Sequence, residues 1–131
     1  MLRIHEHQMA RLRQSSRRDF VGRMVDYLRD AHASDVAAMP GPALEAWVSD
    51  GIDKAKGYGV TMEPEVAQLL LLLLVLGAEA DTDEARPWIR EALTDENLVG
   101  IGKVRKLIHF ARKHRVEGVE KVAVVREVTQ P

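Results

Sequence analysis

The hydrophobic residues of this chain are most concentrated in residues 66–78, which read VAQLLLLLLVLGA and contain six consecutive leucines, Leu69 to Leu74. A surface helix alternates apolar and polar sides, whereas this stretch is apolar all round. It is shorter than the roughly 20 residues that a bilayer-spanning helix needs. Leucine also favours a helix over a strand. The pattern therefore predicts a buried helix at about residues 62–76, surrounded by other helices.

The ends of this stretch carry signals for the start and the end of a helix. Thr61 can cap the first turn, and Glu63 and Glu65 place negative charge beside the helix N-terminus. Gly77 suits the left-handed residue that often follows the last turn. These signals support the assignment of a helix.

Apolar residues recur at helical spacing before this stretch, which predicts two more helices. The first covers about residues 4–31, as one long helix or as two collinear helices with Asp19 capping the second. A connector at residues 33–42 ends in a Pro-Gly-Pro triplet. The second helix covers about residues 43–56. Gly51 inside it costs about 1 kcal/mol relative to alanine, which indicates close packing against another helix.

After Gly77 the chain becomes acidic and then returns to helical spacing twice. Pro87 opens a short helix, because proline is well suited to the first helical position. Thr94 or Asp95 begins a last helix that runs to about Arg115.

Together these elements predict an all-α fold, a compact bundle of four to five helices around the central leucine-rich helix. We expect residues 1–115 to form a single helical domain and residues 116–131 to form a C-terminal tail that is mobile or ordered by a partner. Trp47 and Trp88 lie on the apolar sides of their helices, where core packing is their usual role. Apolar surface beyond what the helices bury would mark a partner site or a homodimer interface.

Composition narrows the classes of function. The 131 residues include no cysteine, which excludes disulfides, thiol catalysis and the common zinc motifs. The net charge of −1 gives no overall attraction to nucleic acid or anionic membrane. The N-terminal residues lack the apolar core of a signal peptide, so we expect no export by that route and a cytoplasmic location without membrane insertion.

Positive charge is nevertheless concentrated locally. The second half of the last predicted helix is strongly basic, and the first helix is rich in arginine. A cluster of like charges can bind phosphates or an acidic partner, although cations at a helix C-terminus are also common without a partner. The residues that we expect to bind a partner are Lys103, Arg105, Lys106, Arg112, Lys113 and Arg115, with Arg13 and Arg17 in the first helix.

The sequence predicts no metal site and no cofactor. His5 and His7 are two residues apart, so on a helix they point to nearly opposite sides. His109 and His114 are five apart, which is also wrong for one helical face. The acidic run that begins at Asp81 lacks the glycine and the closing glutamate of a calcium loop.

No catalytic motif is present either, and two alternatives to protein binding stay open. The first is nucleic-acid binding through the same basic helix, residues 103–115. The second is a small-ligand or enzyme site inside the bundle, which would bring Glu63, His109 or Arg90 together in one pocket.

The phrases RRDFVGRMVDYLRD, ALEAWVSDGIDKAKGYGVTMEPEVAQLLLLLLVLG and DTDEARPWIREAL occur in this order. Over about residues 9–95 the chain resembles small helical proteins encoded in bacterial type VI secretion gene clusters, beside spike, tip and effector genes. The leucine-rich helix and the valine-rich tail depart from that pattern. The resemblance implies a non-enzymatic accessory, such as an effector adaptor, a chaperone or an immunity partner, that binds a secretion effector or a spike component. It brings no catalytic residues to this sequence.

Overall fold

The computed structural model describes residues 6–122, with side chains from Ser16 onward, and this part of the chain is helical without strands. The predicted all-α fold is confirmed over these residues. The α-helices are α1 (Glu6–Ala31), α2 (Gly41–Gly57), α3 (Glu63–Leu76), α4 (Pro87–Leu93) and α5 (Gly100–Lys113). Two 3₁₀ turns accompany them, η1 (Ala80–Thr82) and η2 (Val119–Lys121).

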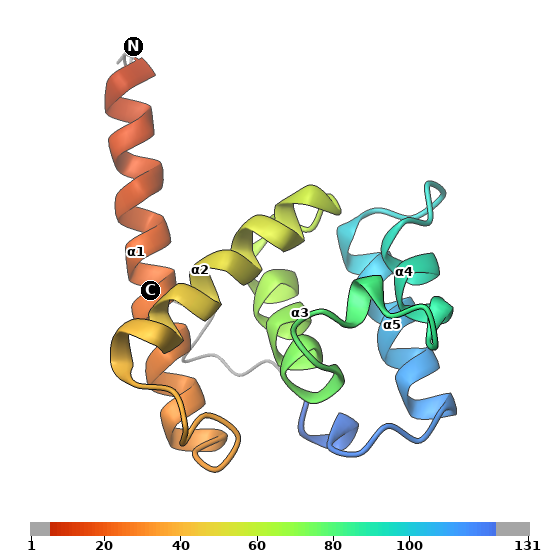
Figure 1. Cartoon of the computed structure of the whole chain (residues 1–131). Coiled ribbons are helices and arrows are strands. Elements are labelled where there is room, and N and C mark those ends of the chain that lie inside the picture. The colour runs from red at the N-terminus through yellow and green to blue at the C-terminus, as the bar shows by residue number, and fades with distance from the viewer. Residues whose placement is uncertain (1–5, 123–131) are drawn as a thin grey trace.

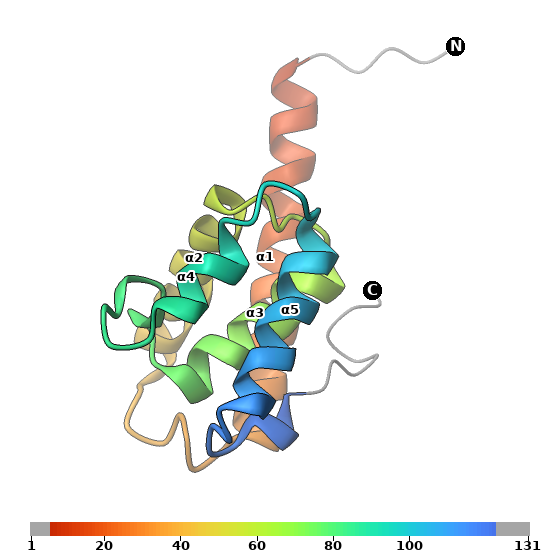
Figure 2. The same cartoon turned by 90° about the vertical axis from the view of Figure 1, so that its right-hand side faces the viewer.

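The central position of α3 organises the arrangement of the other helices. In Figure 1, α1 and α2 lie on one side of α3, and α4 and α5 lie on the other. Helix α3 contacts α2 and α5, while α1 packs on α2 and α4 packs on α5. The N-terminal part of α1 extends beyond the other helices, as Figures 1 and 2 both show.

The leucine run forms the centre of the hydrophobic core. All residues from Leu69 to Leu73 are buried, and Leu74 is partly buried. Full burial of one leucine side chain contributes about 1.5–3 kcal/mol, so this run is a large part of the stabilising free energy. Trp47 and Trp88 are partly buried against the same core, as their positions predict.

Gly51 sits where α2 and α3 approach most closely. The residue is buried, and a Cβ atom added to it would collide with Cδ2 of Leu70 on α3. The helix propensity lost at this glycine therefore permits a close contact between the two helices, as the sequence pattern indicates.

The first helix is continuous. The alternative of two collinear helices that meet near Asp19 is not seen, since α1 runs unbroken from Glu6 to Ala31. Its buried side includes Phe20, Met24 and Leu28, spaced four residues apart. The connector that follows is a series of turns, and Val36 within it is buried in the core.

Two predicted helix starts differ from the structure. Thr61 does not cap α3, because Met62 is the N-cap residue and no side-chain capping hydrogen bond is formed. The last helix begins at Gly100 rather than at Thr94 or Asp95. Oδ1 of Asp95 instead accepts a hydrogen bond from the backbone N–H of Asn97 at 2.9 Å, which stabilises a turn.

The packed domain continues past the expected boundary at residue 115. Residues 116–122 are described, and within them Val119 and Val122 are buried in the core. The 3₁₀ turn η2 packs against α5. Two valines of the valine-rich segment therefore belong to the domain, and the rest of the predicted tail, residues 123–131, lies outside the described residues.

Candidate functional site

The structure divides the basic residues of the last helix into two groups. Lys103 and Lys106 form bonds within the fold. Nζ of Lys103 donates to the backbone carbonyl of Tyr58 at 2.7 Å, and Nζ of Lys106 lies 2.8 Å from Oδ2 of Asp95. The hydrogen bond from Lys106 lowers the pKa of Asp95 below its usual value. These two lysines therefore attach α5 to the preceding connections.

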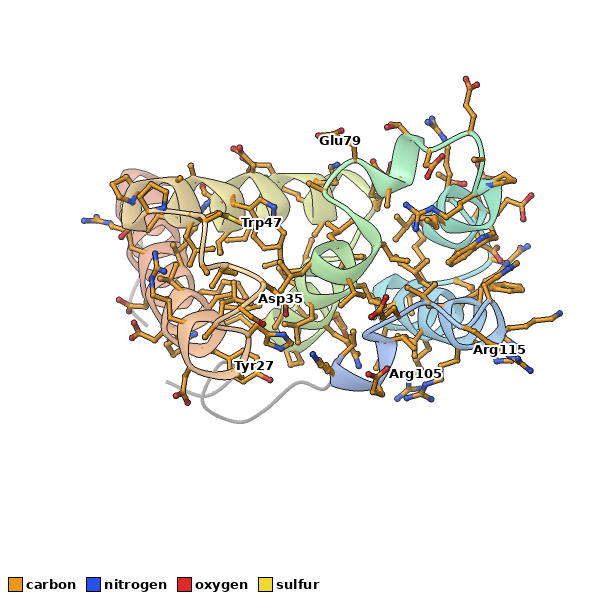
Figure 3. The ribbon with its side chains drawn as sticks, turned by 60° about the horizontal axis from the view of Figure 1, so that its bottom comes forward. Tyr27, Asp35, Trp47, Glu79, Arg105 and Arg115 are labelled. Atoms are coloured by element: carbon orange, nitrogen blue, oxygen red, sulfur yellow. The ribbon has the colours of Figure 1, made fainter. Side chains whose placement is uncertain are left out.

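The other basic residues of this region are exposed and form the surface that we call the cationic face: Arg105, Arg112 and Lys113 on α5, and Arg115 just after it. Within the described part of the chain, no hydrogen bond or ion pair engages these four side chains. Arg105 and Arg112 are seven residues apart, which places them on the same side of α5. Figure 3 shows Arg105 on α5 and Arg115 just beyond its end, both at the outside of the molecule.

Packing against α4 holds the C-terminal end of the cationic face. The rings of Trp88 on α4 and His114 stack, with their centroids 4.6 Å apart and an interplanar angle of 9°. Arg115 follows with a φ of 55°, so the chain turns away directly after α5. The ring of Phe110 lies 5.9 Å from Nζ of Lys113. The stacking of Trp88 and His114 therefore joins the end of α5 to α4.

Arg17 has a role within the fold. Its Nη1 lies 2.9 Å from Oδ1 of Asp53, and its Nη2 donates to the carbonyl and the hydroxyl of Ser49 at 2.8 and 2.9 Å. Arg17 thereby lowers the pKa of Asp53 and joins α1 to α2. The side chain of Arg13, which was predicted to act with it, lies outside the described side chains.

A buried polar cluster joins α2 to the acidic linker, and no sequence pattern predicted it. The side chain of Asp81 in η1 is almost fully buried. Its Oδ1 lies 2.8 Å from Nζ of Lys54, and its Oδ2 accepts a hydrogen bond from Tyr58 Oη at 2.6 Å. Lys54 also donates to the carbonyl of Ala78 at 2.7 Å. Each carboxylate oxygen of Asp81 therefore has a partner.

The pKa values of Tyr58 and Asp81 are both shifted away from neutral pH. Burial, together with the negative charge and hydrogen bond of Asp81, raises the pKa of Tyr58 to about 12. Burial alone would raise the pKa of Asp81, but the bonds from Lys54 and Tyr58 outweigh it and lower that pKa. General acid–base catalysis needs a group that titrates near the working pH. The cluster is thus suited to fixing the linker rather than to transferring protons.

The sequence alone does not distinguish Asp81 and Tyr58 from their neighbours. Asp81 is one of several acids in a run, and Tyr58 stands between two glycines. His32 was also missed, because it is a single histidine after a helix. Its ring is buried and packs edge-on against Tyr27, with Nδ1 3.4 Å from Oδ2 of Asp35.

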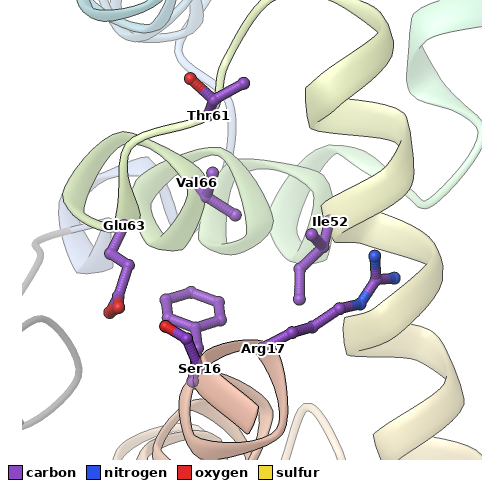
Figure 4. A pocket seen from close by; sticks show the side chains of 7 residues that line it. Ser16, Arg17, Ile52, Thr61, Glu63 and Val66 are labelled. Atoms are coloured by element: carbon purple, nitrogen blue, oxygen red, sulfur yellow. The ribbon is translucent and has the colours of Figure 1, made fainter. Parts of the chain in front are cut away.

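A small hollow lies between α1, α2 and α3 (Figure 4), with a volume of about 240 Å³. Phe20, Ile52 and Val66 provide its apolar lining. Arg17 and Glu63 lie at its edge, and each is already paired, with Asp53 and Arg23 respectively. Ligand pockets are usually larger, about 300–1,000 Å³, so the volume of this hollow lies below their usual range.

The residues that an enzyme site would need are not gathered in one pocket. Glu63 lines the hollow described above, whereas Arg90 lines a different depression of about 600 Å³, together with Asp81 and Glu84. His109 is exposed on α5. Among the described residues, no group of three or more His, Asp or Glu side chains is arranged to hold a metal ion.

Two further findings do not concern a particular site. None of the helices in residues 6–122 combines the length and the apolar character that crossing a membrane requires. Comparison with known proteins finds no matching protein-family model, curated protein or solved structure.

Proposed function

We propose that this protein is an interaction module whose cationic face binds an acidic surface on a protein partner. The single observation that carries this proposal is the division of the basic residues. Lys103 and Lys106 are engaged within the fold, whereas Arg105, Arg112, Lys113 and Arg115 are exposed without a bond to the rest of the described chain.

The packing of α5 supports this assignment. The helix is already folded against α3 and α4, so partner binding does not have to order its backbone, and only the four long side chains lose rotamer freedom. Charge of one sign steers association and selects partners of opposite charge. Arginine in particular can bind a carboxylate with two parallel hydrogen bonds.

The biological role that we propose rests on the sequence resemblance described above. In that role the protein is a cytoplasmic accessory of a type VI secretion module, acting as an adaptor, chaperone or immunity partner. The acidic surface would then belong to a secretion effector or a spike component.

Nucleic acid is the competing partner for the same cationic face, because phosphates also bind arginine. The two partners differ in their response to salt. Phosphate contacts release condensed counterions, so affinity for any duplex falls steeply as the salt concentration rises. Measurable binding to a random-sequence duplex, with a steep dependence on salt, would favour nucleic acid over protein.

Charge reversal with capture from cells of the source organism tests the proposal. The triple variant Arg105→Glu, Arg112→Glu and Lys113→Glu changes the face, while Arg18→Glu, Lys56→Glu and Arg90→Glu gives the same charge change at exposed positions elsewhere. We expect the first variant to lose the captured partner by roughly tenfold or more and the control to retain it. Equal capture by both variants would refute the cationic face as the binding site.

A further inference from the structure

The start of α5 exposes large apolar side chains. Val99 is 75% exposed and Ile101 is 39% exposed, and these two residues flank Gly100 at the first turn of the helix. In Figure 2, α5 lies on the near side of the molecule, beside α4. Single exposed apolar residues are normal on a protein surface, so their meaning depends on what lies beside them.

Ile101 is in line with two cations of the cationic face. Arg105 and Arg112 follow it by whole numbers of helical turns, so the three side chains lie on the same side of α5. We call Ile101, Arg105 and Arg112 the α5 stripe. At 1.5 Å per residue, Arg105 lies about 6 Å along the axis from Ile101, and Arg112 lies about 10 Å further. The α5 stripe therefore has an apolar end and two cations that are two turns apart.

The cations of the α5 stripe are not neutralised by their own helix. Residues 100–113 contain no acid, and the ion pair that α5 forms within the described residues is that of Lys106 with Asp95. The turn η2 packs on α5 and carries Glu120, which forms no ion pair in the described part of the chain. Both guanidinium groups are thus left for carboxylates of another molecule.

A second helix matches the spacing of this stripe better than an extended segment does. Two acids seven residues apart on a helix lie on one side and are also about 10 Å apart. In an extended segment, side chains on one side recur at about 6.6 or 13 Å, and neither spacing matches. An antiparallel helix would also place acids of its N-terminal part beside the cations at the C-terminal end of α5, which suits both helix dipoles.

We propose that the α5 stripe binds an acidic helical segment of the partner in an antiparallel orientation. Two carboxylates of that segment, seven residues apart, bind Arg105 and Arg112, and an apolar side chain four residues further on packs against Ile101 and Val99. This inference rests on the proposed function and names the chemistry of the partner. Charge supplies the attraction, and the apolar contact fixes the register, because one alignment satisfies both.

Fluorescence anisotropy of three labelled synthetic peptides with the full chain tests the proposal. The first is a helical alanine–glutamine peptide with two glutamates seven residues apart and a leucine four residues after the second. In the second peptide serine replaces the leucine, and in the third the second glutamate is moved by two residues, which turns it away from the first. We expect the first peptide to bind with a Kd of about 100 µM at low salt and the others roughly fivefold or more weakly. No binding of the first peptide at about 1 mM, or equal binding of all three, would overturn the proposal.

Variants of the protein show whether the leucine contacts Ile101, with helicity checked by circular dichroism. The advantage of the leucine peptide over the serine peptide should vanish in Ile101→Ser and persist in Ile101→Leu. Arg105→Glu should weaken both peptides, whereas Arg18→Glu at an exposed position on α1 should weaken neither.

The outcomes separate this inference from the proposed function. An advantage of leucine that persists in Ile101→Ser would overturn the helical partner with an apolar contact, while loss of binding in Arg105→Glu would still support the cationic face. Tighter binding of a labelled random-sequence DNA duplex than of the first peptide would assign the α5 stripe to nucleic acid instead. The capture experiment with charge-reversed variants decides the proposed function independently of all three peptides.

Discussion

Tyr58 and Asp81 form a direct hydrogen bond, with 2.6 Å between Oη of the tyrosine and Oδ2 of the carboxylate. It joins the C-cap residue of α2 to η1. Since Lys54 holds the other oxygen of Asp81 at 2.8 Å, one buried carboxylate fixes the position of the acidic linker.

Removing the hydroxyl of Tyr58 should destabilise the fold. We expect Tyr58→Phe to lower the free energy of unfolding by about 1.5–3 kcal/mol, because a buried carboxylate loses one of its donors. Thr82→Val is the control, since it removes an exposed hydroxyl whose bond to the carbonyl of Glu79 is local; its effect should stay within about 0.5 kcal/mol. Urea denaturation measures both, and equal effects of the two variants would contradict a special role for Tyr58.

The same bond predicts how stability depends on alkaline pH. The pKa of Tyr58 is raised from its usual 10.0 to about 12, so its stabilising contribution is complete below pH 10 and is lost as the pH rises toward 12. The difference in unfolding free energy between wild type and Tyr58→Phe should therefore shrink over this range. A difference that stays constant from pH 9 to about pH 12 would show that burial and the bond to Asp81 do not raise the pKa of Tyr58.

At acidic pH the stabilising contribution of Asp81 should be lost as the pH falls. The pKa of Asp81 is lowered from its usual 3.8, so its contribution is present above that value and is lost as the pH falls through the lowered pKa. We expect Asp81→Asn to be less stable than wild type at pH 7 and to approach wild type in strong acid. Denaturation curves measured between neutral pH and about pH 2 check this, and a gap between the two proteins that persists in acid would refute it.

Two glycines on different helices should respond in opposite ways to alanine. Gly22→Ala places a methyl group on exposed α1, where no described atom lies within 4 Å of it, and should raise stability by up to about 1 kcal/mol. Gly51→Ala must displace the fully buried Leu70, and overpacking costs about 1–3 kcal/mol. Thermal unfolding compares them. When Leu70 is first changed to valine, Gly51→Ala should destabilise the protein less. A Gly51→Ala variant that is more stable than wild type would disprove the close contact.

The leucines of α3 offer a matched test of burial. Leu71→Ala removes a fully buried side chain and should cost about 2–5 kcal/mol. Leu74→Ala makes the same chemical change on the same helix at a partly exposed position and should cost clearly less. Similar losses at both positions in chemical denaturation would mean that α3 is not enclosed as described.

The fold could be predicted from the sequence where one physical signal dominated. A helix with six consecutive leucines has to be enclosed by other helices. Gly51 within a helical pattern likewise indicates close packing, and the structure identifies Leu70 as the residue it packs against. The start of α5 could not be predicted, because Asp95 is a good residue both for a helix cap and for a turn. In the structure its carboxylate accepts a hydrogen bond from the N–H of Asn97, which stabilises a turn instead of a helix start.

The basic residues of the candidate site could be listed from the sequence, but which of them are paired within the fold could not be predicted. Spacing alone identified the basic helix, yet it could not show that Lys103 and Lys106 are paired while Arg105 and Arg112 are exposed. That division depends on Tyr58 and Asp95, which are distant in sequence. The burial of Asp81 likewise depends on α2, so no local pattern distinguishes it from its acidic neighbours.

Arginine labelling of the captured complex tests the central claim most directly. Phenylglyoxal modifies accessible guanidinium groups, and mass spectrometry reads each site in the free protein and in the complex. We predict that Arg105, Arg112 and Arg115 become protected by roughly fivefold or more when the partner is bound, while exposed Arg18 on α1 is modified equally in both states. Unchanged modification of all three arginines in the complex would contradict binding through the cationic face.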